Sequence, residues 1–252
     1  MTDFPYSFTA YCLGFVFLLG LKNLPTAFGI YLMVLAFFHF SEYVATGIGN
    51  PQNLSWDSFL VNHSVPYWVA MTASWAEHLA WAWLTPGLHV CTLGGALTRL
   101  GVAVCLLGEG VRKMAMLQAG RNFNHLVQSH KVLRANLSEN RSSLEYFKAD
   151  DHQLVTSGVY SVCRHPSYVG WFFWSVGTQL VLLNPVCFLL YAYVSFSFFS
   201  ERIYVEEYTL ISFFGQDYRD YQARVGTGIP GIRGYEGPPV WGDARAGNRR
   251  QD

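Results

Sequence analysis

Long apolar blocks are the feature that most restricts how this chain can fold. A helix needs about 20 mostly apolar residues to cross a bilayer. Only 13% of the 252 residues are charged, about half the share usual in soluble domains. The sequence therefore predicts an all-α, polytopic integral membrane protein with about six transmembrane helices, and up to eight. The predicted spans are residues 8–21, 26–46, 66–84, 88–118, 166–183 and 186–214.

The distribution of charge predicts which parts face the cytosol. Most of the 17 Lys and Arg residues lie at Arg112 or beyond, and an excess of these residues marks cytosolic segments. We expect residues 119–165 to form a cytosolic connector and residues 217–224 a cytosolic C-terminal helix. The Gly- and Arg-rich tail from Gly226 is expected to be loop, then disordered. These features divide the chain into N-terminal transmembrane helices, 1–118, and a catalytic region, 119–252.

Composition argues against several kinds of ligand. The net charge of zero provides no basic field for nucleic acid. The five cysteines include no C-x-x-C pair, and the eight histidines include no H-E-x-x-H spacing, so we expect neither a disulfide nor a metal site. The first apolar block lacks a basic flank and a small-residue cleavage site, which favours a retained helix over a signal peptide.

One candidate site opens the fifth apolar block. Gly158-Val159-Tyr160 precedes Arg164-His165-Pro166-Ser167-Tyr168. Proline is favoured at the first position of a helix, and the free N–H groups of a helix N-terminus can hold a carboxylate or phosphate. The plainer interpretation is a capped membrane helix whose arginine reaches the interface.

A second candidate site lies near the end of the sixth block, in residues 201–208. Arg202 and Glu206 are four residues apart and therefore share a helix face. A surface ion pair would explain them, but an arginine at the rim of a membrane helix is costly and tends to serve a site. The predicted turn at Asn184-Pro185 brings both candidate sites to the same side of the membrane.

Several stretches of the sequence match one known family. They are Ser41-Glu42-Tyr43, Asn122-Phe123-Asn124-His125 with Gln128, residues 154–160, residues 164–177, and Gly215-x-x-Tyr218-x-x-Tyr221. With them the sequence resembles the animal type of the isoprenylcysteine carboxyl methyltransferase family, from about Cys12 to Gly234. Two differences are a longer, more charged stretch from Ser129 to Asp151 and Gly226, where the resemblance leads us to expect proline.

The resemblance implies methylation, dependent on S-adenosylmethionine, of the C-terminal carboxylate of prenylated cysteine. The implied partners are small GTPases and other CaaX proteins, and the implied location is the endoplasmic reticulum membrane with the active site facing the cytosol. Arg202 resembles the catalytic contact to the substrate carboxylate. The residues that resemble cofactor contacts are Gln128, His152, Gln153, Leu154, Val155, Tyr160, His165, Pro166, Ser167, Tyr168 and Glu206.

This chemistry makes few demands on the protein. A terminal carboxylate with a reference pKa near 3.5 is ionised at neutral pH and needs no general base. What remains is alignment and removal of water. We therefore expect Arg202 to orient the carboxylate more than to activate it. We also expect the prenyl chain to enter sideways from the bilayer, between helices walled by residues such as Phe173, Trp174, Phe196 and Phe199.

Three other functions remain open at this level. A methyltransferase acting on phospholipid amines would need no carboxylate site. A nicotinamide-dependent sterol reductase would bind a reduced dinucleotide. A channel or transporter would use Glu42, Glu77 and His78 as an ion path, although hydrogen bonding between helices explains these residues more simply.

Overall fold

The structure is a computed structural model that describes residues 4–61, 64–87, 92–123 and 153–237. It consists of two compact units, which we treat separately. Unit 1 comprises Met1–Gly120 and Ser167–Phe196, and unit 2 comprises Arg121–Pro166 and Ser197–Asp252. A division by compactness is not a division by function, so the catalytic region proposed for residues 119–252 stays a prediction.

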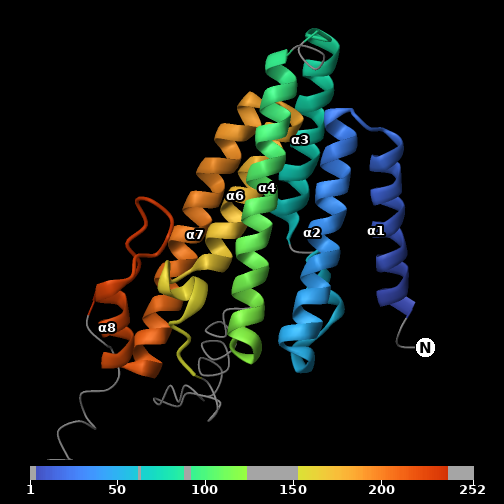
Figure 1. Ribbon diagram of the computed structural model, residues 1–252. Helices are drawn as coiled ribbons and strands as arrows, with labels where there is room; N and C mark the ends of the chain where they lie inside the picture. Colours follow the sequence, from blue (N-terminus) through green and yellow to red (C-terminus); the bar gives the residue numbers. More distant parts are fainter. Residues whose placement is uncertain (1–3, 62–63, 88–91, 124–152, 238–252) are drawn as a thin grey trace, which may run out of the picture. The chain divides into compact units, whose positions relative to one another are not determined.

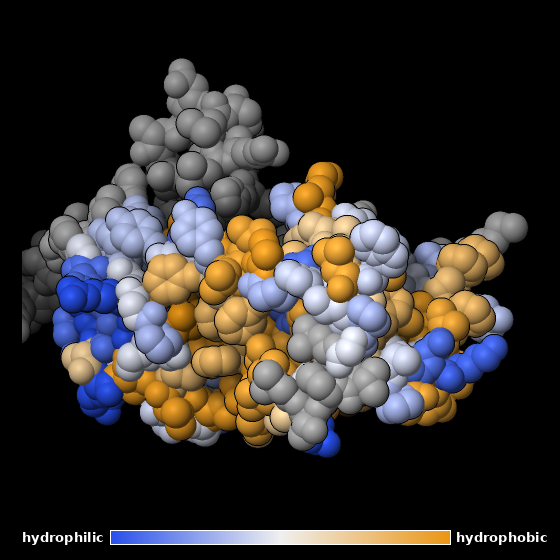
Figure 2. All heavy atoms as spheres, turned by 90° about the horizontal axis from the view of Figure 1, so that it is seen from above, coloured by the Kyte–Doolittle hydropathy of each residue, from blue (hydrophilic) through white to orange (hydrophobic). Residues whose placement is uncertain are grey.

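The prediction of an all-α membrane fold is confirmed. Each predicted span contains a helix, and the described ranges contain no strand. By length and apolar composition, α1, α2 and α7 could each cross a membrane. Large hydrophobic side chains such as Leu18, Phe37 and Leu189 are exposed on these three helices, as lipid contact requires. Hydrophobic residues also occupy much of the face seen from above in Figure 2. The helices of Figure 1 are α1 (Phe4–Lys22), α2 (Ala27–Gly49), α3 (Val65–Leu84), α4 (Thr92–Ala119), α6 (Pro166–Leu182), α7 (Pro185–Phe214) and α8 (Gln216–Arg224).

In unit 1, α1 and α2 form a closely packed hairpin (Figure 1). The hydroxyl of Thr26 caps α2 by accepting a hydrogen bond from the amide of Gly29 at 3.0 Å, which satisfies one of the free donors at the helix start. A Cβ atom added at Gly20 would lie 2.6 Å from the carbonyl oxygen of Gly29. The absence of side chains at these two positions therefore lets the helix backbones touch.

The same device joins α4 to α6. A Cβ atom at Gly170 would lie 2.4 Å from the carbonyl oxygen of Gly108, and one at Gly101 would lie 2.5 Å from the amide nitrogen of Val181. Gly177 likewise packs against Cys105. Small residues favour close helix packing in membranes, where lipid tails compete with apolar side chains for contact. This seam therefore fixes the distance between the two helices.

Polar side chains inside unit 1 connect helices. The carboxylate of Glu77 in α3 accepts hydrogen bonds from the amides of Val186 and Cys187, at 2.8 and 2.6 Å, and so caps the start of α7. Nδ1 of His78 lies 2.8 Å from the carbonyl oxygen of Leu182. Glu42 pairs with Arg112 of α4. The interpretation of these residues as inter-helix hydrogen-bond partners is confirmed.

In unit 2, the predicted C-terminal helix is α8. The segment after it, from Val225 to Gly237, is a loop, as expected, but it is packed rather than loose: Thr227, Ile229 and Ile232 are all buried. The rest of the tail, for which we predicted disorder, lies outside the described residues.

Candidate active site

Arg164 organises the site of unit 2. Its guanidinium donates hydrogen bonds to the carbonyl oxygens of Gln222 and Arg233, both at 3.1 Å, and to that of Val225. The backbone amide of Arg164 also donates to the carbonyl oxygen of Gly226 at 2.8 Å. The side chain is 4% exposed. Arg164 therefore fastens the loop after α8, and the alternative of an arginine reaching the membrane interface is wrong.

Glu207 holds the charge that balances Arg164. Its side chain is fully buried and belongs to α7. A carboxylate offers about four lone-pair sites, and here five donors share them. The donors are Nε of Arg164 at 2.7 Å, Nε2 of His165 at 3.0 Å, Nε2 of Gln222 at 3.1 Å, the amide of Tyr235 at 2.9 Å and the hydroxyl of Tyr218 at 3.3 Å.

Glu207 was missed in the sequence, where Glu206 was singled out instead. Adjacent residues on a helix point about 100° apart, because a turn takes 3.6 residues. Glu207 falls on the face of Ile203 and Ile211, both of which are buried, whereas the side chain of Glu206 is 31% exposed. The apolar neighbours four residues away on each side were the available signal.

His165 lies between the two glutamates. Its Nε2 atom faces Glu207, and its Nδ1 atom lies 4.0 Å from a carboxylate oxygen of Glu206. A carboxylate paired with arginine can only accept, so Nε2 carries a proton. Glu207 thereby fixes the orientation of the ring and leaves Nδ1 on the side of the more exposed Glu206.

The segment before Arg164 is held against α7 and α8. Leu154 packs on Ile211, Tyr218 and Tyr221, and the hydroxyl of Tyr221 donates to the carbonyl oxygen of Tyr160 at 2.5 Å. Burial raises the pKa of both Tyr218 and Tyr221, and the nearby carboxylate of Glu207 adds to the effect at Tyr218. Both phenols therefore act as neutral hydrogen-bond donors.

The other predicted site residues fall in three places. The amide of Gln153 donates to Oδ1 of Asn122 at 3.2 Å, inside unit 2. Ser167 and Tyr168 belong to unit 1. Gln128 and His152 lie outside the described residues. Cys163, close in sequence to the site, is buried, and this raises the pKa of its thiol, so it is poorly suited to act as a nucleophile.

Arg202 lies on the same face of α7 as Phe198 and Glu206, with its guanidinium carbon 5.8 Å from the centroid of the Phe198 ring. The residue is half-buried. Arg202 is therefore more accessible than Arg164, whose guanidinium is buried and donates four hydrogen bonds to protein acceptors. Among the described residues, no group of His, Cys, Asp and Glu is arranged to hold a metal ion.

The apolar helices define an integral membrane protein. Its site in unit 2 combines a buried, charge-balanced Arg164 with Arg202 and Glu206, which are only partly buried. Residues 101–212 match the model of the isoprenylcysteine carboxyl methyltransferase family. The chain belongs to this family.

Relatives and a solved structure agree along most of the chain. Protein-S-isoprenylcysteine O-methyltransferase from Tribolium castaneum is 47% identical over 92% of this chain and 78% of its own length. The Homo sapiens protein of that name is 44% identical over 88% and 73%. The solved structure of the eukaryotic intramembrane Ras methyltransferase, an isoprenylcysteine carboxyl methyltransferase, superposes with a TM-score of 0.83 at 46% identity, covering 94% of this chain and 80% of that one.

Proposed function

We propose that this enzyme transfers a methyl group from S-adenosylmethionine to the C-terminal carboxylate of prenylated cysteine in CaaX-processed proteins such as small GTPases. The observation that carries the proposal is the 47% identity to a protein-S-isoprenylcysteine O-methyltransferase over 92% of the chain. The membrane is proposed to be that of the endoplasmic reticulum, with the site on the cytosolic side, where the Lys- and Arg-rich segments are expected.

The direct test is transfer of a labelled methyl group by the purified protein to a farnesylcysteine analogue. A phospholipid amine serves as the competing acceptor, and binding of a reduced nicotinamide dinucleotide is measured in parallel. Methylation of the farnesylcysteine alone supports the proposal. Methylation of the phospholipid amine alone, or binding of the dinucleotide without any methyl transfer, would overturn it.

The roles proposed for the residues follow from the charges on the reactants. When bound, S-adenosylmethionine supplies a methyl group that is already activated by its sulfonium centre. The substrate carboxylate is ionised at neutral pH, so the protein needs no general base. Arg202 is proposed to hold this carboxylate through charged hydrogen bonds. The remaining task of the protein is to align the reactants away from water.

The residues present fit the cofactor. The half-exposed carboxylate of Glu206 can accept hydrogen bonds from hydroxyl or amino groups, and Nδ1 of His165 points toward the same side. The proposed contacts are Gln128, His152, Gln153, Leu154, Val155, Tyr160, His165, Pro166, Ser167, Tyr168 and Glu206.

Replacement of His165, Tyr168 or Glu206 by alanine should each weaken binding of S-adenosylmethionine. A hydrogen bond to a charged group contributes about 1.5–3 kcal/mol, so Glu206→Ala should raise the dissociation constant by at least about tenfold. Titration calorimetry on each variant measures this. Glu201→Ala is the matched control, since Glu201 is an exposed carboxylate on the same helix. Unchanged affinity in all three variants would place the cofactor elsewhere.

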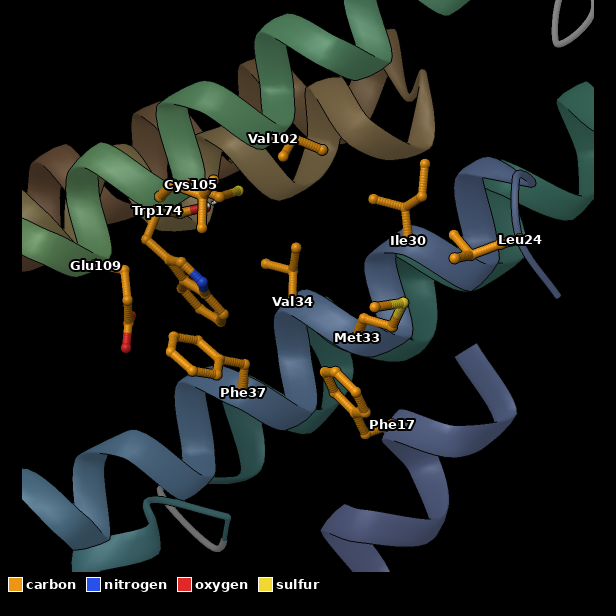
Figure 3. A pocket seen from close by; sticks show the side chains of 11 residues that line it. Phe17, Leu24, Ile30, Met33, Val34, Phe37, Val102, Cys105, Glu109 and Trp174 are labelled. Atoms are coloured by element: carbon orange, nitrogen blue, oxygen red, sulfur yellow. Dashed lines mark hydrogen bonds between the residues drawn. The ribbon is translucent and has the colours of Figure 1, made fainter. Parts of the chain in front are cut away.

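The prenyl chain is proposed to enter from the lipid. Exposing roughly a dozen apolar carbons to water would cost on the order of 10 kcal/mol, at about 0.8 kcal/mol each, and a lateral route avoids this. Unit 1 contains an apolar groove of about 240 Å³ between α1, α2, α4 and α6 (Figure 3). Trp174, one of the predicted walls, lines this groove. Phe37 and Leu106 also line it, and their side chains are exposed.

This groove is large enough for part of a prenyl chain. An apolar cavity of about 150 Å³ accommodates a benzene molecule, so this groove has room for roughly ten carbon atoms. Its lining is apolar except for Glu109 and the thiol of Cys105. Of the other predicted walls, Phe173 is 42% exposed and Phe199 2% exposed.

Filling the groove should selectively weaken binding of the prenylated substrate. Val34→Trp and Val102→Trp, each placed in the lining, should raise KM for farnesylcysteine several-fold and leave cofactor affinity unchanged. Val194→Trp, on an exposed stretch of α7, is the control. Gly177→Trp is unsuitable, because a Cβ atom there already meets the sulfur of Cys105 at 2.8 Å. Unaltered KM in both groove variants would contradict a role for this groove.

A further inference from the structure

A buried ion pair in unit 1 has no part in the chemistry proposed so far. Arg112 of α4 is 1% exposed, and Glu42 of α2 is fully buried. Nε and Nη2 of the arginine donate to the two carboxylate oxygens of Glu42 at 2.6 and 2.7 Å. Such a two-point pairing fixes the plane of the guanidinium as well as its position.

The remaining nitrogen of the guanidinium holds the first turn of α6. Nη1 of Arg112 donates to the hydroxyl of Ser167 at 2.7 Å and lies 3.3 Å from its carbonyl oxygen. The guanidinium carbon also lies 4.7 Å from the centroid of the Trp171 ring, one turn further along α6. A single side chain therefore ties together α2, α4 and the start of α6.

The cluster is balanced in charge. Nζ of Lys113 pairs with Glu42 and, at 3.1 Å, with Glu109, and the hydroxyl of Ser41 donates to Glu109. Two cations thus face two carboxylates in an apolar surrounding.

Stability alone is a weak reason for such a pair, because buried ion pairs can often be replaced by apolar residues of similar volume without loss of stability. The glycine seam between α4 and α6 already fixes the distance between these helices. The hydrogen bonds from Arg112 to Ser167 and its contact with Trp171 add a polar constraint at the first turn of α6, beyond the end of that seam.

We propose that Glu42 and Arg112 are positioning residues that set the first turn of α6 so that Ser167 and Tyr168 can contact the cofactor. This inference rests on the proposed function, in which those two residues bind S-adenosylmethionine. Arg112 acts through Ser167 and touches no reactant. Lysine cannot substitute for it, since one ammonium group cannot serve both oxygens of Glu42 and the hydroxyl of Ser167 at once.

The test distinguishes a positioning role in cofactor binding from a purely structural link between the helices. The double variant E42M/R112M replaces the pair with apolar side chains, and Arg112→Lys keeps the charge but not the fork. We expect both to retain the unfolding temperature of the parent to within a few degrees. We also expect their dissociation constants for S-adenosylmethionine to rise about tenfold or more. Calorimetry and thermal unfolding are measured in the same detergent.

Glu77→Gln is the matched control, because Glu77 also ties two helices of unit 1 but at the start of α7. It should lower the unfolding temperature without changing cofactor affinity. If folded E42M/R112M binds the cofactor as the parent does, the inference is wrong. If the double variant fails to fold, parent-like affinity in Arg112→Lys overturns the inference equally. If the parent itself does not bind the cofactor, the proposed function fails instead.

Discussion

Replacing Arg202 with alanine should abolish most of the methyl transfer while leaving cofactor binding largely intact. The guanidinium is proposed to make charged hydrogen bonds to the substrate carboxylate, each contributing about 1.5–3 kcal/mol. Since 1.36 kcal/mol corresponds to a tenfold change in rate, losing two such bonds should lower kcat/KM by roughly a hundredfold or more. Methyl transfer to farnesylcysteine and calorimetry with S-adenosylmethionine measure the two effects separately.

Two further variants sharpen this prediction. Arg202→Lys should recover little activity, because an ammonium group cannot reproduce the planar fork of donors. Arg224→Ala removes an exposed arginine of α8 and should leave the rate unchanged. Near-normal turnover of Arg202→Ala would show that another group holds the carboxylate.

Gly234→Ala should be among the most damaging single-atom changes in unit 2. Gly234 has a φ of +82°, a backbone conformation that favours glycine. A Cβ atom there would lie 1.8 Å from a carboxylate oxygen of Glu207, so either Glu207 or the loop must move. Breaking a buried ion pair typically costs about 3–5 kcal/mol. We expect a lower unfolding temperature together with a loss of cofactor affinity, because His165 also depends on Glu207.

A second glycine of the same loop provides the control. A Cβ atom at Gly226 would meet nothing within 4 Å, so Gly226→Ala should be close to neutral. If Gly234→Ala has the same unfolding temperature and the same cofactor affinity as the parent, the described packing of the loop against Glu207 is wrong.

The helices could be predicted because apolar blocks of about 20 residues have few alternatives to a membrane helix. Arg164 and His165 were found because they open such a block. Glu207 was not found, since its burial depends on which face of α7 turns inward. Arg112 entered the prediction only as the start of the Lys- and Arg-rich part of the chain. Packing shows that its partner is Glu42, 70 residues away in sequence.

The packed loop after α8 escaped prediction for a related reason. Its five glycines and its proline are typical of an unstructured tail. Its order depends on carbonyl groups that have no sequence signature, because every residue carries one. Here Arg164 binds the carbonyl groups of Val225 and Arg233 through its guanidinium and that of Gly226 through its backbone amide. Ile229 and Ile232 of the same loop are buried.

The glycine seam between α4 and α6 also acts as a barrier. The two backbones touch at Gly108 and Gly170. A hydrocarbon chain is too wide to pass between α4 and α6 at this contact. A sideways entrance in unit 1 therefore cannot lie between α4 and α6 where these backbones touch. A bulky residue in the seam would force the helices apart and let lipid enter between α4 and α6.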